Sequence, residues 1–173
     1  LLGNNASLEN QDWLNIRIPE KPFDALICTG NSIAHLPPHY LGQVLEKFSK
    51  FLRPQGLLVI DIYTDDEWNL CEDQRIVPRS CIRQANNFSV VIFRDRFLTK
   101  HEFKYTVKSV DIMKFDISGL PLQMESFEVV QFVIKSDDLL NAIESTQKFE
   151  DIEQFSISSN ERFVYFSARR KGD

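Results

Sequence analysis

The chain has 173 residues, which fits one domain with a sizeable core. Hydrophobic residues make up 43% and charged residues 26%, as in ordinary globular proteins, and the net charge of −5 argues against nucleic-acid binding through bulk electrostatics. No run of about 18 apolar residues predicts a membrane span. The three cysteines form no Cys-x-x-Cys pair, so we expect a reducing, cytoplasmic location without a disulfide framework or a zinc site.

The first predicted unit is a strand, a helix and a second strand. Residues 23–29 form a short apolar run bounded by turn residues, which is typical of a buried parallel strand. After Pro37 and Pro38, apolar residues recur at helical spacing from Leu41 to Leu52. Residues 53–56 stop this helix, and residues 57–62 read as the second strand. Such a βαβ unit predicts that the two strands are parallel.

The rest of the chain predicts mainly strands. Residues 64–87 are polar, and only a short helix beginning near Asp65 is suggested there. From Phe88 the hydrophobic period becomes two, which indicates an antiparallel meander. Its expected strands are 89–98, 102–115 and 125–135. Ser136 is expected to cap a following helix, with Asp137 and Asp138 in its first turn. Two more strands are expected at 151–158 and 162–169.

A polar turn follows the first predicted strand. It contains Gly30, Asn31, Ser32 and His35. Open α/β sheets bind ligands beyond the carboxyl ends of their strands, and a glycine there lets a ligand approach the backbone closely. The alternative is a turn glycine with an asparagine that bonds its own loop, and a histidine that only fixes that loop.

The run Gly-Asn-Ser-Ile-Ala-His-Leu at residues 30–36 resembles the middle of class I S-adenosylmethionine-dependent methyltransferases. Its closest match is the glycine/sarcosine N-methyltransferase group. Residues 56–61 resemble the next strand of that family, and residues 103–107 resemble a strand of its substrate-side insertion. Residues 149–153 and 163–169 resemble its last two strands. The resemblance covers nearly the whole chain from Gln11 onward.

This resemblance implies an α/β fold, namely the C-terminal half of a Rossmann-like methyltransferase sheet. Its strands would lie in the family order 4-5-7-6, with the seventh antiparallel. Residues 1–173 would form one domain that contains an antiparallel insertion at 88–135. The family's glycine loop is absent, so we expect the trailing part of a longer enzyme, or a chain that has lost its front half. Strand 23–29 would then have an open apolar edge, covered by the missing half, a partner chain or a second copy.

The resemblance also implies a cofactor, S-adenosylmethionine, and a small-molecule amine as methyl acceptor. Such an enzyme holds the lone pair and the methyl group in line and excludes water, without a metal or a catalytic nucleophile. The acceptor side would consist of the Gly30 carbonyl, the Asn31 side chain and the Tyr105 hydroxyl. Tyr105 has an alternative reading as a cross-strand packing aromatic.

Four residues are expected on the cofactor side: Asp12, Trp13, Thr29 and His35. The family usually has Asn-Trp where this chain has Asp12-Trp13, and a carboxylate still suits the exocyclic amine of adenine. Thr29 would contribute mainly its backbone beside the adenosine. The alternative for Trp13 is a peripheral core aromatic.

This sequence departs from the family at one position that bears on the choice of methyl acceptor. Glycine-methylating relatives carry an arginine that clamps the substrate carboxylate, and Tyr63 stands at that position here, so glycine itself is doubtful. Tyr63 and Trp68 would favour a more methylated amine through cation–π contact, unless Arg94 or Arg96 replaces the clamp. Two other functions stay open: a non-catalytic half-domain that binds a partner, and a methyltransferase acting on oxygen or on a protein side chain.

Overall fold

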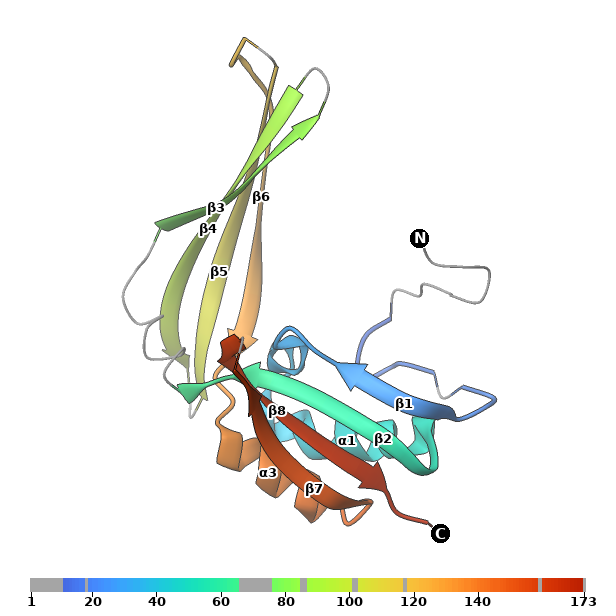
Figure 1. The fold of residues 1–173 in the computed structure, drawn as a ribbon. Coiled ribbons are helices and arrows are strands. Elements are labelled where there is room, and N and C mark those ends of the chain that lie inside the picture. The colour runs from blue at the N-terminus through green and yellow to red at the C-terminus, as the bar shows by residue number, and fades with distance from the viewer. Residues whose placement is uncertain are drawn as a thin grey trace.

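The computed structural model describes residues 11–17, 19–65, 76–84, 87–100, 103–116, 118–158 and 160–172. These residues form two four-stranded sheets, one mixed and one antiparallel (Figure 1). The mixed sheet has the order β1-β2-β8-β7 and is backed by two helices. The second sheet has the order β3-β4-β5-β6 and extends from the first as a long arm.

The four strands of the arm follow one another along the chain and are inserted between β2 and β7 of the mixed sheet. The mixed sheet consists of β1 (Phe23–Cys28), β2 (Leu52–Tyr63), β7 (Phe149–Ile157) and β8 (Asn160–Arg170). The arm consists of β3 (Ile76–Gln84), β4 (Asn87–Lys100), β5 (Phe103–Asp116) and β6 (Pro121–Phe132). The helical elements are the 3-10 turns η1 (Ser32–His35) and η2 (Pro38–Tyr40) and the helices α1 (Leu41–Phe51) and α3 (Ser136–Ser145).

The mixed sheet has the predicted topology. β1 pairs with β2 in parallel, whereas β2–β8 and β8–β7 are antiparallel pairs. If β1 and β2 are counted as the family's strands 4 and 5, the order becomes 4-5-7-6 with the seventh strand antiparallel. The predicted α/β class, the half-sheet and the antiparallel insertion are therefore confirmed.

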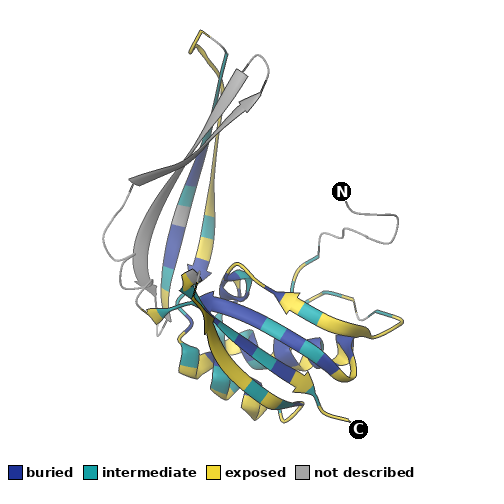
Figure 2. Cartoon of the chain, in the orientation of Figure 1, coloured by how far each residue is buried: buried dark blue, intermediate teal, exposed yellow. Residues whose placement is uncertain are grey.

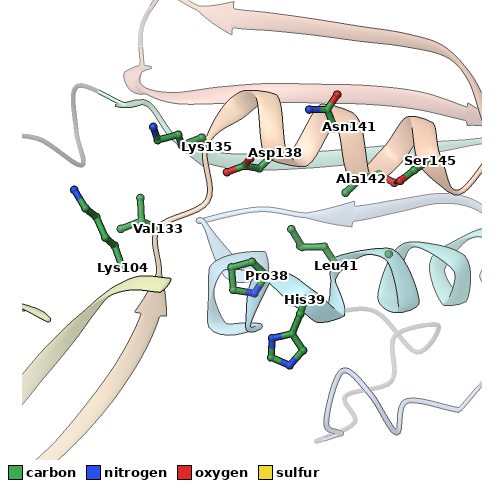
Figure 3. A pocket seen from close by; sticks show the side chains of 11 residues that line it. Pro38, His39, Leu41, Lys104, Val133, Lys135, Asp138, Asn141, Ala142 and Ser145 are labelled. Carbon is green, nitrogen blue, oxygen red and sulfur yellow. The ribbon is translucent and has the colours of Figure 1, made fainter. Parts of the chain in front are cut away.

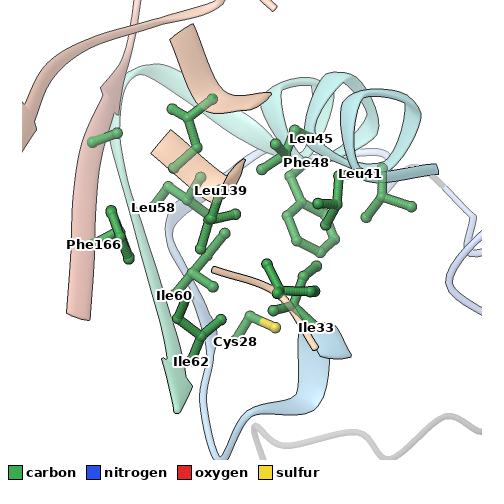
Figure 4. Packing of buried hydrophobic residues seen from close by; sticks show 14 of the residues in the cluster. Cys28, Ile33, Leu41, Leu45, Phe48, Leu58, Ile60, Ile62, Leu139 and Phe166 are labelled. Carbon is green, nitrogen blue, oxygen red and sulfur yellow. The ribbon is translucent and has the colours of Figure 1, made fainter. Parts of the chain in front are cut away.

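One face of the mixed sheet carries the main core. The apolar stripe predicted for the first helix is buried, with Val44, Leu45 and Phe48 at most 1% exposed. These side chains meet alternate residues of β2 and, from α3, Leu139 and Ile143 (Figure 4). Full burial of each such side chain stabilises the fold by roughly 1.5–3 kcal/mol. Neither helix of the described residues has the length and hydropathy that a membrane span requires.

The other face of the mixed sheet is not covered by a helix of the described residues. Ile27 on β1 is 67% exposed and Phe155 on β7 is 40% exposed. Figure 2 shows that β2 in the centre is largely buried, whereas the edge strand β7 is largely exposed. β1 is the other edge strand, so its outer side has no partner among the described strands.

The second predicted strand begins earlier than the sequence suggested. Residues 53–56 were expected to be a stop, but β2 already starts at Leu52, which pairs with Phe23. Gly56 allows this irregular start, because a Cβ there would lie 2.8 Å from the Arg53 carbonyl oxygen and 3.2 Å from that of Phe23. A register shift between Phe23 and Ala25 absorbs the extra residues.

One detail of the prediction is wrong, and one segment had no strand assigned from the sequence. Ser136 is the first residue of α3 rather than its cap; the capping position is Lys135, and no side chain caps the helix. Asp137 and Asp138 lie in the first turn as expected, where they interact favourably with the helix dipole. The polar segment 64–87 contains β3, an edge strand whose ladder is interrupted between Pro78 and Ser80, as proline requires. The helix suggested near Asp65 lies almost wholly outside the described residues.

Candidate active site at the carboxyl ends of β1 and β2

The polar turn after β1 has a special backbone geometry. Gly30 has φ +73° and Asn31 has φ +56°, so both adopt the left-handed conformation. Their backbone N–H groups consequently converge on one carboxylate at the end of β2: Gly30 N–H donates to Asp61 Oδ2 at 3.0 Å, and Asn31 N–H donates to Oδ1 at 2.7 Å. Asp61 is 3% exposed, so these are buried, charge-assisted hydrogen bonds. They hold the turn against the sheet.

Asn31 presents a buried amide with one unused donor. Its side-chain Oδ1 accepts a hydrogen bond from the Tyr63 N–H at 3.3 Å, and the residue is 0% exposed. Its Nδ2 has no hydrogen-bond partner within the described structure. A buried donor without a partner costs about 1–3 kcal/mol, so Asn31 Nδ2 calls for an acceptor from outside the described residues.

Local hydrogen bonds fix the rest of the turn. The Ser32 hydroxyl donates to the Thr29 carbonyl oxygen at 2.5 Å, and Ala34 N–H donates to the Asn31 carbonyl oxygen at 3.1 Å. The Thr29 carbonyl is thus engaged within the chain. No described group donates a hydrogen bond to the carbonyl of Gly30, which is exposed. The exposed Gly30 therefore offers a backbone acceptor beside the buried donor of Asn31.

The floor of the turn is formed by Cys28, which is buried. Burial, and secondly the charge of Asp61, raise the pKa of this thiol from 9.0 to about 12, although a hydrogen bond from the backbone of Ile33 opposes the shift. A thiol with such a pKa is uncharged at neutral pH and is a poor nucleophile. Cys28 therefore has the environment of a packing residue, with an uncharged thiol at neutral pH.

His35 connects the turn to the arm. Its Nδ1 lies 2.8 Å from the carbonyl oxygen of Val130, and its Nε2 lies 3.4 Å from the side-chain nitrogen of Gln131, both on β6. Because a carbonyl can only accept, Nδ1 carries the proton and neutral Nε2 faces the Gln131 donor. Both ring nitrogens are thus engaged within the chain. This arrangement agrees with the alternative in which His35 fixes the loop.

Tyr105 lies on the arm, at the end nearest the mixed sheet. It pairs with Phe132 across β5 and β6, and their ring centroids are 5.9 Å apart. The next pair, Thr106 with Gln131, points to the opposite face of the arm, and Gln131 is the residue that meets His35. No hydrogen bond or ring contact between described residues joins Tyr105 to Gly30 or Asn31.

Asp12 and Trp13 lie beside α1. The Trp13 and Phe48 rings are 5.6 Å apart, and the Lys47 ammonium donates a hydrogen bond to the Leu14 carbonyl oxygen. Asp12 accepts the Leu14 N–H at 2.7 Å, which closes a local turn. No hydrogen bond or ring contact between described residues joins this pair to the Gly30–Asn31 turn, and Trp13 has the packing of a peripheral core aromatic.

The Tyr63 side chain has an aromatic and a cationic neighbour, Phe163 and Arg162. Its ring centroid is 5.0 Å from that of Phe163, and the Arg162 guanidinium lies 5.7 Å from it. Position 63 therefore has a guanidinium next to it, although the residue itself is a tyrosine. Arg162 was not considered from the sequence, because only the antiparallel pairing of Tyr63 with Phe163 brings it there. Trp68 and the side chains of Arg94 and Arg96 lie outside the described residues.

Asp61 is a second site residue that sequence reasoning missed. It appeared only as the last residue of an apolar strand match, and it lies 31 positions from Gly30. The available signal was a carboxylate at the carboxyl end of a buried strand, beside a second strand that ends in a glycine turn. A buried acid at that place requires donors, and the turn N–H groups are the nearest ones.

Both the sequences of curated proteins and solved structures support the resemblance to methyltransferases. No family model matches the chain. Among curated proteins, glycine N-methyltransferase of Mus musculus is 40% identical over 68 residues, which is 34% of this chain and 22% of that protein. Glycine N-methyltransferase of Rattus norvegicus is 42% identical over 62 residues, 31% of this chain and 21% of that protein.

Solved structures match over almost the whole chain. The sugar N-methyltransferase KedS8 from Streptoalloteichus superposes with a TM-score of 0.74 at 18% identity and covers 94% of this chain. CalS10, an amino pentose methyltransferase from Micromonospora echinaspora, gives 0.66 at 15% identity over 93% of this chain. The chain spans 61% of the length of KedS8 and 63% of that of CalS10. The fold is therefore that of class I S-adenosylmethionine-dependent methyltransferases, and the resemblance seen in the sequence is confirmed.

Proposed function

We propose that this chain forms the acceptor side of an S-adenosylmethionine-dependent methyltransferase that methylates the nitrogen of a small-molecule amine. The observation that carries the proposal is the turn at the end of β1. Asp61 holds two backbone N–H groups there, and the fully buried Asn31 amide keeps one donor without a partner. Names of relatives support the same chemistry, since they include glycine, sugar and amino pentose methyltransferases.

The residues of the turn fit the acceptor side of such a site. The Gly30 carbonyl is an acceptor for an amine N–H, and the Asn31 Nδ2 is a donor for an oxygen of the same substrate. Two contacts of opposite polarity on adjacent residues fix the direction of the amine lone pair. When bound, S-adenosylmethionine supplies an activated methyl group on a positively charged sulfur. The chain then has to orient the amine and exclude water.

For the cofactor side of the site we propose the same residues that the sequence predicts. Thr29 contributes backbone at the mouth of the turn, and Asp12 and Trp13 would border the adenine from the segment beside α1. His35 contributes through its contacts with β6, which set the distance between the turn and the arm. Tyr105 stays a predicted acceptor-side residue of that arm, on the face opposite to the Gln131 side chain that meets His35. Asp61 acts through the turn and is a positioning residue.

The surroundings of Tyr63 favour an acceptor other than glycine. The paired rings of Tyr63 and Phe163 form an aromatic wall that suits the methyl groups of a methylated amine. Arg162 beside that wall provides a charge for an acceptor that has an acidic group. We therefore expect sarcosine-like amines or amino sugars to be better acceptors than glycine.

A substrate panel tests this proposal. Methyl transfer from S-adenosylmethionine is measured by mass spectrometry for glycine, sarcosine, dimethylglycine and an amino sugar, with the chain and with its Asn31→Ala and Tyr63→Arg variants. The proposal expects an N-methylated product, at least a tenfold lower kcat/KM in Asn31→Ala, and a shift of preference toward glycine in Tyr63→Arg. Gln43→Ala, which removes an exposed amide from α1, is the matched control and should keep full activity. An unchanged substrate ranking in Tyr63→Arg would refute the role of the aromatic wall.

A further inference from the structure

A groove on the helical side of the molecule is separate from the turn. Its volume is about 630 Å³, within the range of small-molecule sites, and it lies between α3 and the start of α1 (Figure 3). Lys104 at the beginning of β5 closes one end. Adjacent strand residues point to opposite faces, so the side chains of Lys104 and Tyr105 project from opposite faces of β5. None of the residues that line the groove is among those proposed for the methyl-transfer site.

The polar groups of the groove favour an anion at one end. Lys104 and Lys135 both line that end, with Asp138 as the acidic side chain nearby (Figure 3). Lys104 and Lys135 bring two ammonium groups to this lining and Asp138 brings one carboxylate, in a chain whose net charge is −5. The N-terminus of α3, a helix of 10 residues, adds its positive dipole end there, and no side chain caps it.

The remaining lining is largely apolar. Leu41 and Ala142 face each other from the two helices, and Val133 lies between the lysine end and α3 (Figure 3). The lining residues Val133 and Lys104 are joined by a backbone hydrogen bond, in which the Val133 N–H donates to the Lys104 carbonyl oxygen at 3.0 Å. A cationic end joined to an apolar trough suits a molecule with an acidic head and a compact apolar body.

From this arrangement we propose that the groove is a binding site for a small organic carboxylate. The carboxylate lies between the Lys104 and Lys135 ammonium groups, and the apolar body lies along Leu41 and Ala142. The site bridges both sheets, because Lys104 belongs to the arm whereas α1 and α3 cover the mixed sheet. Binding there stabilises the position of the arm relative to the helices. This inference does not depend on the proposed methyl transfer.

Gly42 provides a direct way to block the site. It lines the groove in the first turn of α1, and a Cβ at this position would meet no atom within 4 Å. A leucine side chain there fills the groove without a clash at its Cβ. Gly42→Leu is therefore expected to fold and to lose the ligand site, whereas removal of the lysines leaves the space and removes the charge.

The experiment titrates 2-naphthoate into the ¹⁵N-labelled 173-residue chain and follows amide shifts by NMR. We expect saturable shifts at Gly42 and Ala142, at least tenfold weaker binding in Lys104→Gln/Lys135→Gln, and no detectable binding in Gly42→Leu. The matched control Lys50→Gln/Lys171→Gln removes the same charge from exposed positions and should change the dissociation constant less than twofold. The uncharged analogue 2-naphthalenemethanol should bind at least tenfold more weakly than 2-naphthoate.

Three results would overturn the proposal. The first is the absence of saturable shifts in the wild-type chain at millimolar naphthoate. The second is equal weakening in the two double-lysine variants, which would mean a general charge effect. The third is a set of shifts centred on Ile27 and Val59, which would place the probe on the uncovered face of the mixed sheet. Urea unfolding of each variant confirms that it is folded before its titration is interpreted.

Discussion

Asp61 determines the geometry of the turn because its two carboxylate oxygens accept the N–H groups of both Gly30 and Asn31. We expect Asp61→Asn to lower the free energy of unfolding by about 1–3 kcal/mol, since an amide nitrogen would face one of these donors and leave it buried without an acceptor. Urea unfolding measures the change. Asp24→Asn serves as the control, because that carboxylate is 85% exposed in its pair with Arg53 and should matter little. Equal effects of the two substitutions would contradict the role of Asp61.

The raised pKa of the Cys28 thiol predicts that the free energy of unfolding depends on pH. Its pKa is raised from 9.0 to about 12 in the folded chain, so above pH 9 the unfolded chain releases a proton that the folded chain retains. The stabilisation is complete below pH 9 and is lost as the pH rises toward 12, with a slope of about 1.4 kcal/mol per pH unit. The difference between wild type and Cys28→Ala in chemical unfolding from pH 8 to 11 isolates this term from other groups. Parallel pH profiles would show that the thiol is not buried in this way.

The residues predicted for the site differ in how far the sequence could place them. Gly30, Asn31 and Thr29 follow a strand directly, so the strand itself puts them at the mouth of the sheet. Tyr105 is separated from them by the arm, and its neighbours depend on where β5 and β6 meet η1. Local patterns cannot give that distance, because it is set by tertiary contacts such as His35 with Val130.

At the level of elements, two glycines have opposite roles. Gly42 lies in α1 with free space around its missing Cβ, whereas a Cβ at Gly56 would lie 2.8 Å from the Arg53 carbonyl oxygen. Gly42→Ala should raise the unfolding free energy by up to about 1 kcal/mol through helix propensity. Gly56→Ala should lower it by about 1–3 kcal/mol, because the start of β2 must shift. Thermal and urea unfolding of the pair check both signs, and a stabilising Gly56→Ala would refute the close approach.

Elements with a strong local pattern were predicted well. The apolar run of β1 and the amphipathic stripe of α1 need no information beyond their own residues. The early start of β2 and the whole of β3 depend on pairing with Phe23 and with β4, respectively. Strand pairing over such distances overrides the turn signals of Pro54, Gly56 and Pro78, which is why these parts were missed.

At the scale of the whole molecule, no helix of the described residues covers the second face of the mixed sheet. Ile27, 67% exposed, lies on the edge strand β1, and a hydrophobic edge of this kind is prone to pair with another chain. We expect the 173-residue chain to self-associate and Ile27→Lys to weaken that association at least tenfold in sedimentation velocity. Gln43→Lys, which adds the same charge to the exposed face of α1, should not. A wild-type chain that stays monomeric at 100 μM would contradict this expectation.

The central claim is that the turn held by Asp61 is half of a methyltransferase site. Calorimetric titration of S-adenosylhomocysteine into the 173-residue chain, with the intact mass verified on the same sample, tests it most directly. The account predicts saturable binding that weakens at least tenfold in Asp61→Asn, while Asp24→Asn binds like the wild type. A folded chain that binds no S-adenosylhomocysteine, or whose binding is unaffected by Asp61→Asn, would contradict the account and favour a non-catalytic module.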